Sequence, residues 1–358
     1  MTKRIALALQ GGGVHAAFAW GVVDRLLVQV AAGEVEIAGI SGASSGALNA
    51  VALAYGLREG ADLPGPAAAR TRRMAQAARA KLEEMWSAVA QAAFWSGNPL
   101  AAAIALSWGW NIDDSPAARW AETMGAAPTT ETGVGIYLNG LLRDVFPHLP
   151  AILAAPVAAV PPVMISATEV RHCRRELFVD GAISPAAMRA ALGGATAGAI
   201  EVHGGQYWDG AYLGNPPLVP LLARVRPQGC DDLLVVGVTP LVHDEAPRGS
   251  GQRLNRLREI AFSAALVQEV AAIETVNALA GPEGRPIHLH RLHADARIVR
   301  LGAHSKEAPA WDFLTHLRDM GQNAFDAGWP DIVRALGRQS SWDTGALADR
   351  VIERGALK

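Results

Sequence analysis

The chain has few cysteines, almost no net charge and no long uninterrupted apolar run. Only two of its 358 residues are cysteines, Cys173 and Cys230, which are too few for a disulfide framework and lack metal-ligand spacing. The formal net charge of −2 supplies no overall basic field, so we expect no nucleic-acid partner. The scarcity of cysteine fits a reducing compartment, and we expect a cytoplasmic location.

No membrane-spanning helix is evident in the sequence, and we expect none. The longest apolar candidate, around 151–167, contains Pro156, Pro161 and Pro162, which interrupt a helix. The start of the chain resembles a signal peptide, but its short apolar run is broken at once by glycines. Ile5–Leu9 is better explained as a buried strand. Peripheral contact with a membrane stays open.

Half of the residues are hydrophobic, which is enough for a large core. The first 57 residues predict strand, helix, strand and helix, an alternation typical of a parallel sheet covered by helices. Further strands are predicted at 160–170, 176–181, 233–240 and 286–292, a hairpin at 201–208 with Gly204 and Gly205 at its tip, and helices at 68–93, 252–280 and 312–337. No linker divides the chain, so we expect one three-layer domain over 1–358.

A tryptophan-rich insert lies at 94–120 and includes Trp95, Trp108, Trp110 and Trp120. Tryptophan suits a boundary between an apolar and a wet environment. The insert is therefore either a part of the core or a lid with a lipid-facing rim. The sequence leaves both interpretations open.

Two serines follow the second predicted strand in the run GISGASSGALN. A nucleophile elbow needs Gly-x-Ser-x-Gly, because side chains two positions before and after the serine would clash in the tight turn. Ser44 has Gly42 and Gly46 at these positions, whereas Ser41 lacks the second glycine. The turn also places backbone N–H groups and the positive helix end beside a developing oxyanion. The pattern predicts a nucleophile at Ser44, with a simple turn of small residues as the alternative.

The glycines that follow the first predicted strand are Gly11, Gly12 and Gly13. One interpretation is a dinucleotide-binding fingerprint, because an acidic residue follows at Glu34 or Glu36. A second is an oxyanion hole made of backbone N–H groups, and a third is a tight turn. Neighbouring parallel strands end at the same sheet edge, so the glycines should face the serine turn, which favours the oxyanion hole.

A serine hydroxyl needs a base to become a useful nucleophile. His288, His290 and His293 are candidates for a histidine triad, although a hydrolase serine of that kind usually follows more than two strands. Asp209 is the other candidate, because it follows a predicted strand and Gly210 permits a sharp exit. Since Asp-Gly is also common in turns, both bases stay open at this point.

Three segments in order carry a family resemblance: the glycine run, the Gly-x-Ser-x-Gly turn, and Asp-Gly-Ala at 209–211 followed by Asn and Pro. Together they resemble the patatin-like phospholipase family, and its bacterial members in particular. The motifs cover a catalytic region over 5–222, and strands and helices over 223–358 would complete the same domain. The resemblance implies a three-layer α/β/α fold with a mainly parallel central sheet.

The resemblance also implies a Ser–Asp dyad without a catalytic histidine, cofactor or metal. Ser44 would be the nucleophile and Asp209 the base. The oxyanion loop would consist of Gly11, Gly12 and Gly13, and the supporting positions would be Gly42, Gly46, Gly210 and Ala211. The implied activity is hydrolysis of lipid or other carboxylic esters, as in a phospholipase A, a lysophospholipase or a carboxylesterase. An acyltransferase with the same dyad, or a nucleotide- or lipid-binding protein with a relic site, remains an alternative.

The chain departs from the family pattern at several positions. His15 stands where the family has Arg or Lys, and Ala16 replaces a glycine. Ala211 stands at the third position of Asp-Gly-Gly. The stretch before Asp209 lacks the Ser, Pro and Phe of the family. The last of these changes concerns the acyl pocket, and together the differences bear on the choice of substrate and on the activity itself.

Overall fold

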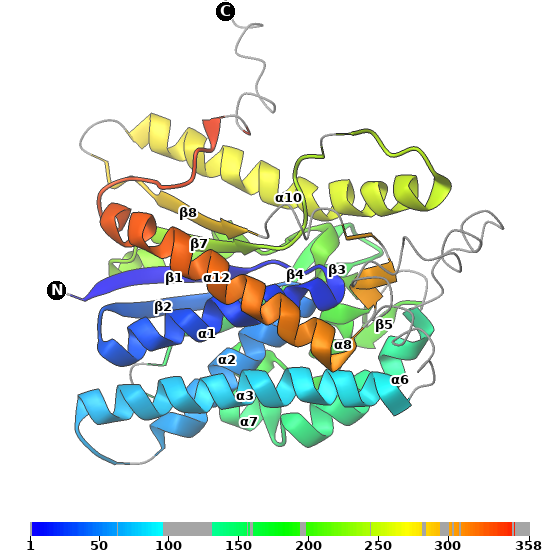
Figure 1. The fold of residues 1–358 in the computed structure, drawn as a ribbon, viewed down its shortest axis with the longest axis horizontal. Coiled ribbons are helices and arrows are strands. Elements are labelled where there is room, and N and C mark those ends of the chain that lie inside the picture. Colours follow the sequence, from blue (N-terminus) through cyan, green and yellow to red (C-terminus); the bar gives the residue numbers. More distant parts are fainter. Residues whose placement is uncertain are drawn as a thin grey trace, which may run out of the picture.

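The computed structural model describes residues 2–347, apart from 63, 96–130, 156, 158–159, 194–197, 244, 281–283, 294–300, 303, 308 and 346. Within these residues a central sheet lies between two layers of helices (Figure 1). Most of the tryptophan-rich insert falls outside the described residues, so its interpretation as core or lid stays a prediction.

The sheet consists of β1 (Lys3–Leu9), β2 (Val35–Gly42), β3 (Val163–Glu169), β4 (Arg174–Val179), β5 (Ile200–Val202), β6 (Gly205–Asp209), β7 (Asp232–Gly237) and β8 (His288–His293). The strand order is β5-β6-β3-β2-β1-β7-β8, and β4 also pairs with β3. In this order the pairs β3–β2, β2–β1, β1–β7 and β7–β8 are parallel. The pairs β5–β6, β6–β3 and β4–β3 are antiparallel. The expected α/β fold with a mainly parallel central sheet is confirmed.

The helices are α1 (Ala17–Ala32), α2 (Ser45–Ala61), α3 (Ala67–Trp95), α6 (Glu131–Val145), α7 (Leu149–Ala154), α8 (Pro185–Leu192), α9 (Leu218–Val225), α10 (Ser250–Ala280) and α12 (Trp311–Ala335). Strand residues such as Leu7 and Val236 pack into a core with α1, α2 and α12. Their neighbours Ala8 and Val235 face the other way, into a core with α9 and α10. Burial on both faces explains why these strands form continuous apolar runs in the sequence.

Among the described residues, Gly13–Ala32 alone is long and apolar enough to cross a membrane, and 72% of its apolar window is buried in the fold. A Cβ added at Gly21 of α1 would lie 1.8 Å from the backbone oxygen of Arg318 on α12. Gly321 of α12 packs equally closely on Phe18. The two helices therefore meet backbone to backbone, and α1 behaves as a core helix.

Candidate active site

The C-terminal ends of β2 and β6 meet along one edge of β3. The other edge of β3 is occupied by β4, which pairs with β3 from Met164 to Glu169. The strands β2 and β6 therefore share the remaining edge. On the shared edge, Gly42 of β2 pairs with Ile165, and Asp209 of β6 pairs with Ala167. Because β2 is parallel and β6 antiparallel to β3, their ends point toward each other. Two residues of strand span about 7 Å, so the sheet brings Asp209 close to the turn that carries Ser44.

Ser44 lies in a strained turn between β2 and α2. Its φ of 51° and ψ of −134° place a non-glycine residue in a sparsely populated backbone region. A Cβ on Gly42 would lie 2.4 Å from the backbone oxygen of Gly46. A Cβ on Gly46 would lie 2.2 Å from the oxygen of Leu9. Both flanking positions thus require glycine, which is the geometry of a nucleophile elbow.

The glycine run packs directly against this elbow. A Cβ on Gly11 would lie 2.5 Å from both the Cβ of Ser44 and the backbone oxygen of Ala43. The N–H of Gly12 donates to Oγ of Ser45, the next residue, at 3.1 Å. Gly13 is exposed and has a φ of 63°. The structure therefore brings the glycine loop and Ser44 together at the same edge of the sheet.

The three glycines differ in what their backbone groups do. The N–H of Gly11 donates to Oδ1 of Asn215 at 2.7 Å, and the hydroxyl of Thr239 donates to its carbonyl oxygen at 3.1 Å. Since Asn215 is fully buried, this amide is already paired inside the protein. Gly11 thus anchors the loop. The N–H of Gly12 is also paired, but its acceptor is the rotatable hydroxyl of Ser45 at 3.1 Å, so the amides of Gly12 and Gly13 are the better candidates for donors to an oxyanion.

Asp209 is the last residue of β6 and is 6% exposed. Its Oδ1 accepts a hydrogen bond from the N–H of Ala211 at 2.8 Å, and its backbone oxygen accepts one from the hydroxyl of Thr168 at 2.8 Å. A Cβ on Gly210 would lie 2.0 Å from the backbone oxygen of Ser166. The Asp-Gly-Ala sequence is therefore needed locally, because the glycine fits against β3 and the next amide orients the carboxylate.

Asn215 is a residue of the site that the sequence indicated only as the asparagine after the Asp-Gly-Ala segment. The chain leaves Asp209 through a short 3₁₀ turn, and the hydroxyl of Ser166 donates to the backbone oxygen of Gly214 at 2.8 Å. Asn215 then contacts both backbone groups of Gly11, accepting from its N–H and donating to its oxygen at 3.4 Å. This segment links the carboxylate to the glycine loop.

His15 does not provide the surface cation that the family pattern suggests at its position. Its side chain is buried, and its Nε2 lies 3.0 Å from Oγ of Ser305. Its ring also contacts Phe313 of α12 edge-on, with ring centroids 6.2 Å apart. The residue therefore fastens the segment around Ser305 to the end of the glycine loop.

A cluster of Lys306, Glu259 and Asn255 connects α10 to the glycine loop. The backbone oxygen of Lys306 would lie 2.4 Å from a Cβ on Gly13, so the two segments touch. Nζ of Lys306 donates to Oε1 of Glu259 at 2.8 Å and to Oδ1 of Asn255 at 2.7 Å. Burial alone would raise the pKa of Glu259, but Lys306 and the neighbouring basic groups hold the pKa of this carboxyl below its ordinary value.

The late histidines lie away from Ser44. His290 on β8 is fully buried, with Nε2 3.0 Å from Oδ1 of Asp232 and Nδ1 2.9 Å from Oγ of Ser341. Asp232 is the first residue of β7, so this hydrogen-bonded chain sits toward the opposite end of the parallel strands. His293 ends β8, three strand spacings from β2, or about 14 Å. The strand register therefore argues against a triad of Ser44 with these histidines.

We expect His290→Ala to lower stability without lowering turnover by more than about twofold, because the side chain is remote from the site. The change leaves Asp232 buried with the N–H of Gly337 as a remaining donor, and such a loss costs about 1–3 kcal/mol. Thermal unfolding and ester hydrolysis, measured on one preparation, check this. Loss of turnover in a protein that remains folded would restore the triad interpretation.

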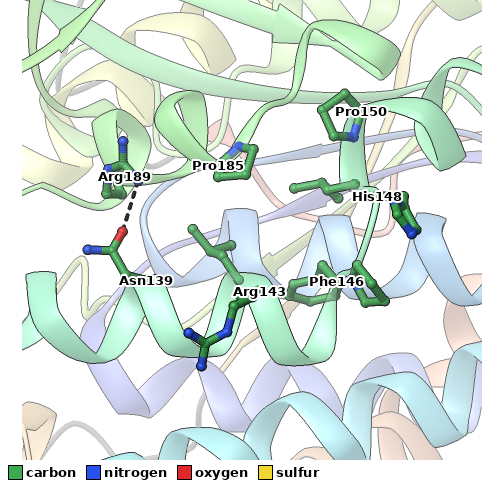
Figure 2. A pocket seen from close by; sticks show the side chains of 10 residues that line it. Asn139, Arg143, Phe146, His148, Pro150, Pro185 and Arg189 are labelled. Atoms are coloured by element: carbon green, nitrogen blue, oxygen red, sulfur yellow. Dashed lines mark hydrogen bonds between the residues drawn. The ribbon is translucent and has the colours of Figure 1, made fainter.

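A separate hollow of about 440 Å³ lies between α6, α7 and α8 (Figure 2). Arg189 reaches across its rim and donates to Oδ1 of Asn139 at 2.9 Å. None of its lining residues belongs to the serine turn, the glycine loop or the Asp-Gly-Ala segment, so the hollow is distinct from the candidate site. In the described part of the chain, no group of three His, Cys, Asp or Glu residues could hold a metal ion.

The sequence of residues 7–222 matches the family model described as patatin-like phospholipase, and this match covers more than half of the chain. The chain belongs to the patatin-like phospholipase family. This patatin-like phospholipase is therefore a lipid acyl hydrolase, an enzyme that acts on carboxylic ester bonds. No curated protein sequence matches it.

Two solved structures are distantly similar to this patatin-like phospholipase. VipD from Legionella pneumophila is 13% identical, with 88% of this chain and 67% of that chain covered and a TM-score of 0.31. The type III effector protein ExoU is 15% identical, with coverages of 90% and 53% and a TM-score of 0.24. Because both scores are low, the assignment rests on the family match and the site geometry rather than on these two structures.

Proposed function

We propose that this patatin-like phospholipase cleaves fatty acyl esters with a Ser44–Asp209 dyad through an acyl-enzyme. The main support is the opposed ends of β2 and β6 on the same edge of β3, which bring a strained serine and a buried carboxylate together. The glycine loop adjoins the same turn. The substrates that fit this chemistry are phospholipids, lysophospholipids and simpler carboxylic esters.

In the first half of the reaction, Oγ of Ser44 attacks the ester carbonyl carbon while Asp209 accepts the hydroxyl proton. The N–H groups of Gly12 and Gly13 would donate to the oxyanion, and losing one such donor typically costs about 10²–10³ in turnover. The carbon–oxygen bond to the alcohol then breaks, and the alcohol leaves with the proton held by Asp209. The acyl group remains on Ser44.

In the second half, water attacks the acyl carbon and gives a proton to Asp209. The ester bond to Ser44 breaks, the fatty acid leaves, and the proton returns to the serine oxygen. An acyltransferase would follow the same path with an alcohol or thiol in place of water. We further propose that the protein works in the cytoplasm, at the surface of a membrane that supplies its substrate.

The proposal is tested by incubating the protein with p-nitrophenyl esters of increasing chain length, with phosphatidylcholine and with lysophosphatidylcholine. We expect release of free fatty acid and, after rapid quenching, one acyl group on the peptide that contains Ser44. Products formed with added glycerol separate hydrolysis from acyl transfer. If no ester is cleaved and no acyl group appears on Ser44, the dyad is a relic.

A further inference from the structure

The first half of α10 exposes large apolar side chains to solvent. Leu254, Leu257 and Ile260 are 38%, 62% and 54% exposed, and Val242 in the preceding loop is 54% exposed. The three helix residues are spaced three apart and thus lie on successive turns of one broad side. The three helix residues form what we call the docking face. Contiguous exposed apolar patches on a soluble protein usually mark interaction sites.

The opposite side of the same half-helix holds the loops of the candidate site. Glu259 binds Lys306, which covers Gly13 of the glycine loop. Phe262 packs edge-on against Tyr212, three residues beyond the proposed base, with ring centroids 5.0 Å apart. Figure 1 shows α10 along one face of the sheet, with its first half extending past the ends of the strands. The docking face is therefore the outer side of α10, and the inner side of the same helix contacts the loops of the candidate site.

Basic residues flank the docking face. Arg248 and Arg253 are both exposed, and they are linked by a hydrogen bond from Nη1 of Arg253 to the backbone oxygen of Arg248. Among the described residues nearby, the carboxylate of Glu245 is exposed and paired with Arg248, while that of Glu259 is buried and already neutralised by Lys306. A surface with apolar residues on one side and arginines at its margin is typical of helices that lie in the interface of an anionic bilayer.

We propose that the docking face inserts shallowly into the interface of an anionic lipid bilayer and so holds the enzyme at the membrane that contains its substrate. The proposal rests on the proposed function, since a lipid acyl hydrolase must reach an ester that is held in a membrane. Apolar side chains enter the acyl boundary, and the arginines contact anionic head groups. The bilayer thus buries apolar surface that is exposed to water in the free protein.

The test compares the wild type with the double variant Leu257→Glu/Ile260→Glu and with a control variant, Leu279→Glu. Leu279 is on the same helix and is 81% exposed, but it lies at the far end, near Glu274. Co-sedimentation uses vesicles of phosphatidylcholine alone and vesicles that also contain phosphatidylglycerol. Each protein is also assayed on phospholipid in the same vesicles and on a short, soluble p-nitrophenyl ester.

We expect the wild type and Leu279→Glu to bind the anionic vesicles alike. The double variant should bind at least about tenfold more weakly and lose vesicle hydrolysis in proportion, with soluble-ester turnover unchanged. Unchanged binding of the double variant, equal loss in the control, or no binding by the wild type would overturn the docking face. If binding follows the prediction but no protein cleaves either substrate, the proposed function fails while the docking face stands.

Discussion

Ser44→Ala and Asp209→Asn are each expected to lower ester turnover by at least about 10³-fold. Without the hydroxyl, no acyl-enzyme forms, and without the carboxylate, no group beside the elbow accepts its proton. Asparagine keeps an oxygen that can accept the hydrogen bond from the N–H of Ala211, so Asp209→Asn should stay folded. Rates on a soluble ester, together with circular dichroism, separate loss of chemistry from loss of structure.

The chain offers a matched control for each of these variants. Ser41 lies in the same run but is fully buried and has no hydrogen-bond partner for its Oγ within the described residues, so Ser41→Ala should keep its activity. Asp180 begins a second Asp-Gly-Ala sequence, and its Oδ1 accepts from the N–H of Val163 at 2.9 Å and from Arg58 at 3.2 Å. Asp180→Asn should therefore cost stability rather than turnover. Full activity in Ser44→Ala would contradict the dyad.

The two Asp-Gly-Ala sequences have identical residues but different places in the fold. Asp180 follows β4, whose last residue pairs with Met164, so it lies near the start of β3. Asp209 instead ends β6, which shares the other edge of β3 with β2, and its partner Ala167 is two residues beyond Ile165, the partner of the last residue of β2. Neither pairing can be predicted from the local residues, because both tripeptides are identical. The family resemblance favoured Asp209, and the strand register gives the physical reason.

Local features of the fold were predictable for a different reason. The alternation of strands and helices over the first 57 residues follows from apolar periodicity, and the elbow at Ser44 follows from glycines within two residues of it. The contact of Asn215 with Gly11 joins residues 204 positions apart, and that of Lys306 with Glu259 joins residues 47 apart. Such polar pairs leave no periodic signal in a single sequence, so only the folded chain reveals them.

Gly11→Ala is expected to lower turnover by about 10²-fold or more, since a displacement near 1 Å in an active site can cost that much. The added Cβ would meet the backbone oxygen of Ala43 and the Cβ of Ser44, both at 2.5 Å. A backbone oxygen cannot rotate away as a side chain can, so either the elbow or the glycine loop must shift. The shift would misalign the serine with the amides that receive the oxyanion.

Gly140→Ala provides the control for this variant. Gly140 lies in α6, and an added Cβ there meets nothing within 4 Å. Alanine in a helix interior is favoured over glycine by about 1 kcal/mol, so this change should raise the melting temperature and leave turnover unchanged. For Gly11→Ala, labelling of Ser44 by a fluorophosphonate should slow together with kcat. A Gly11→Ala protein that keeps wild-type rates would show that the glycine loop does not set the position of Ser44.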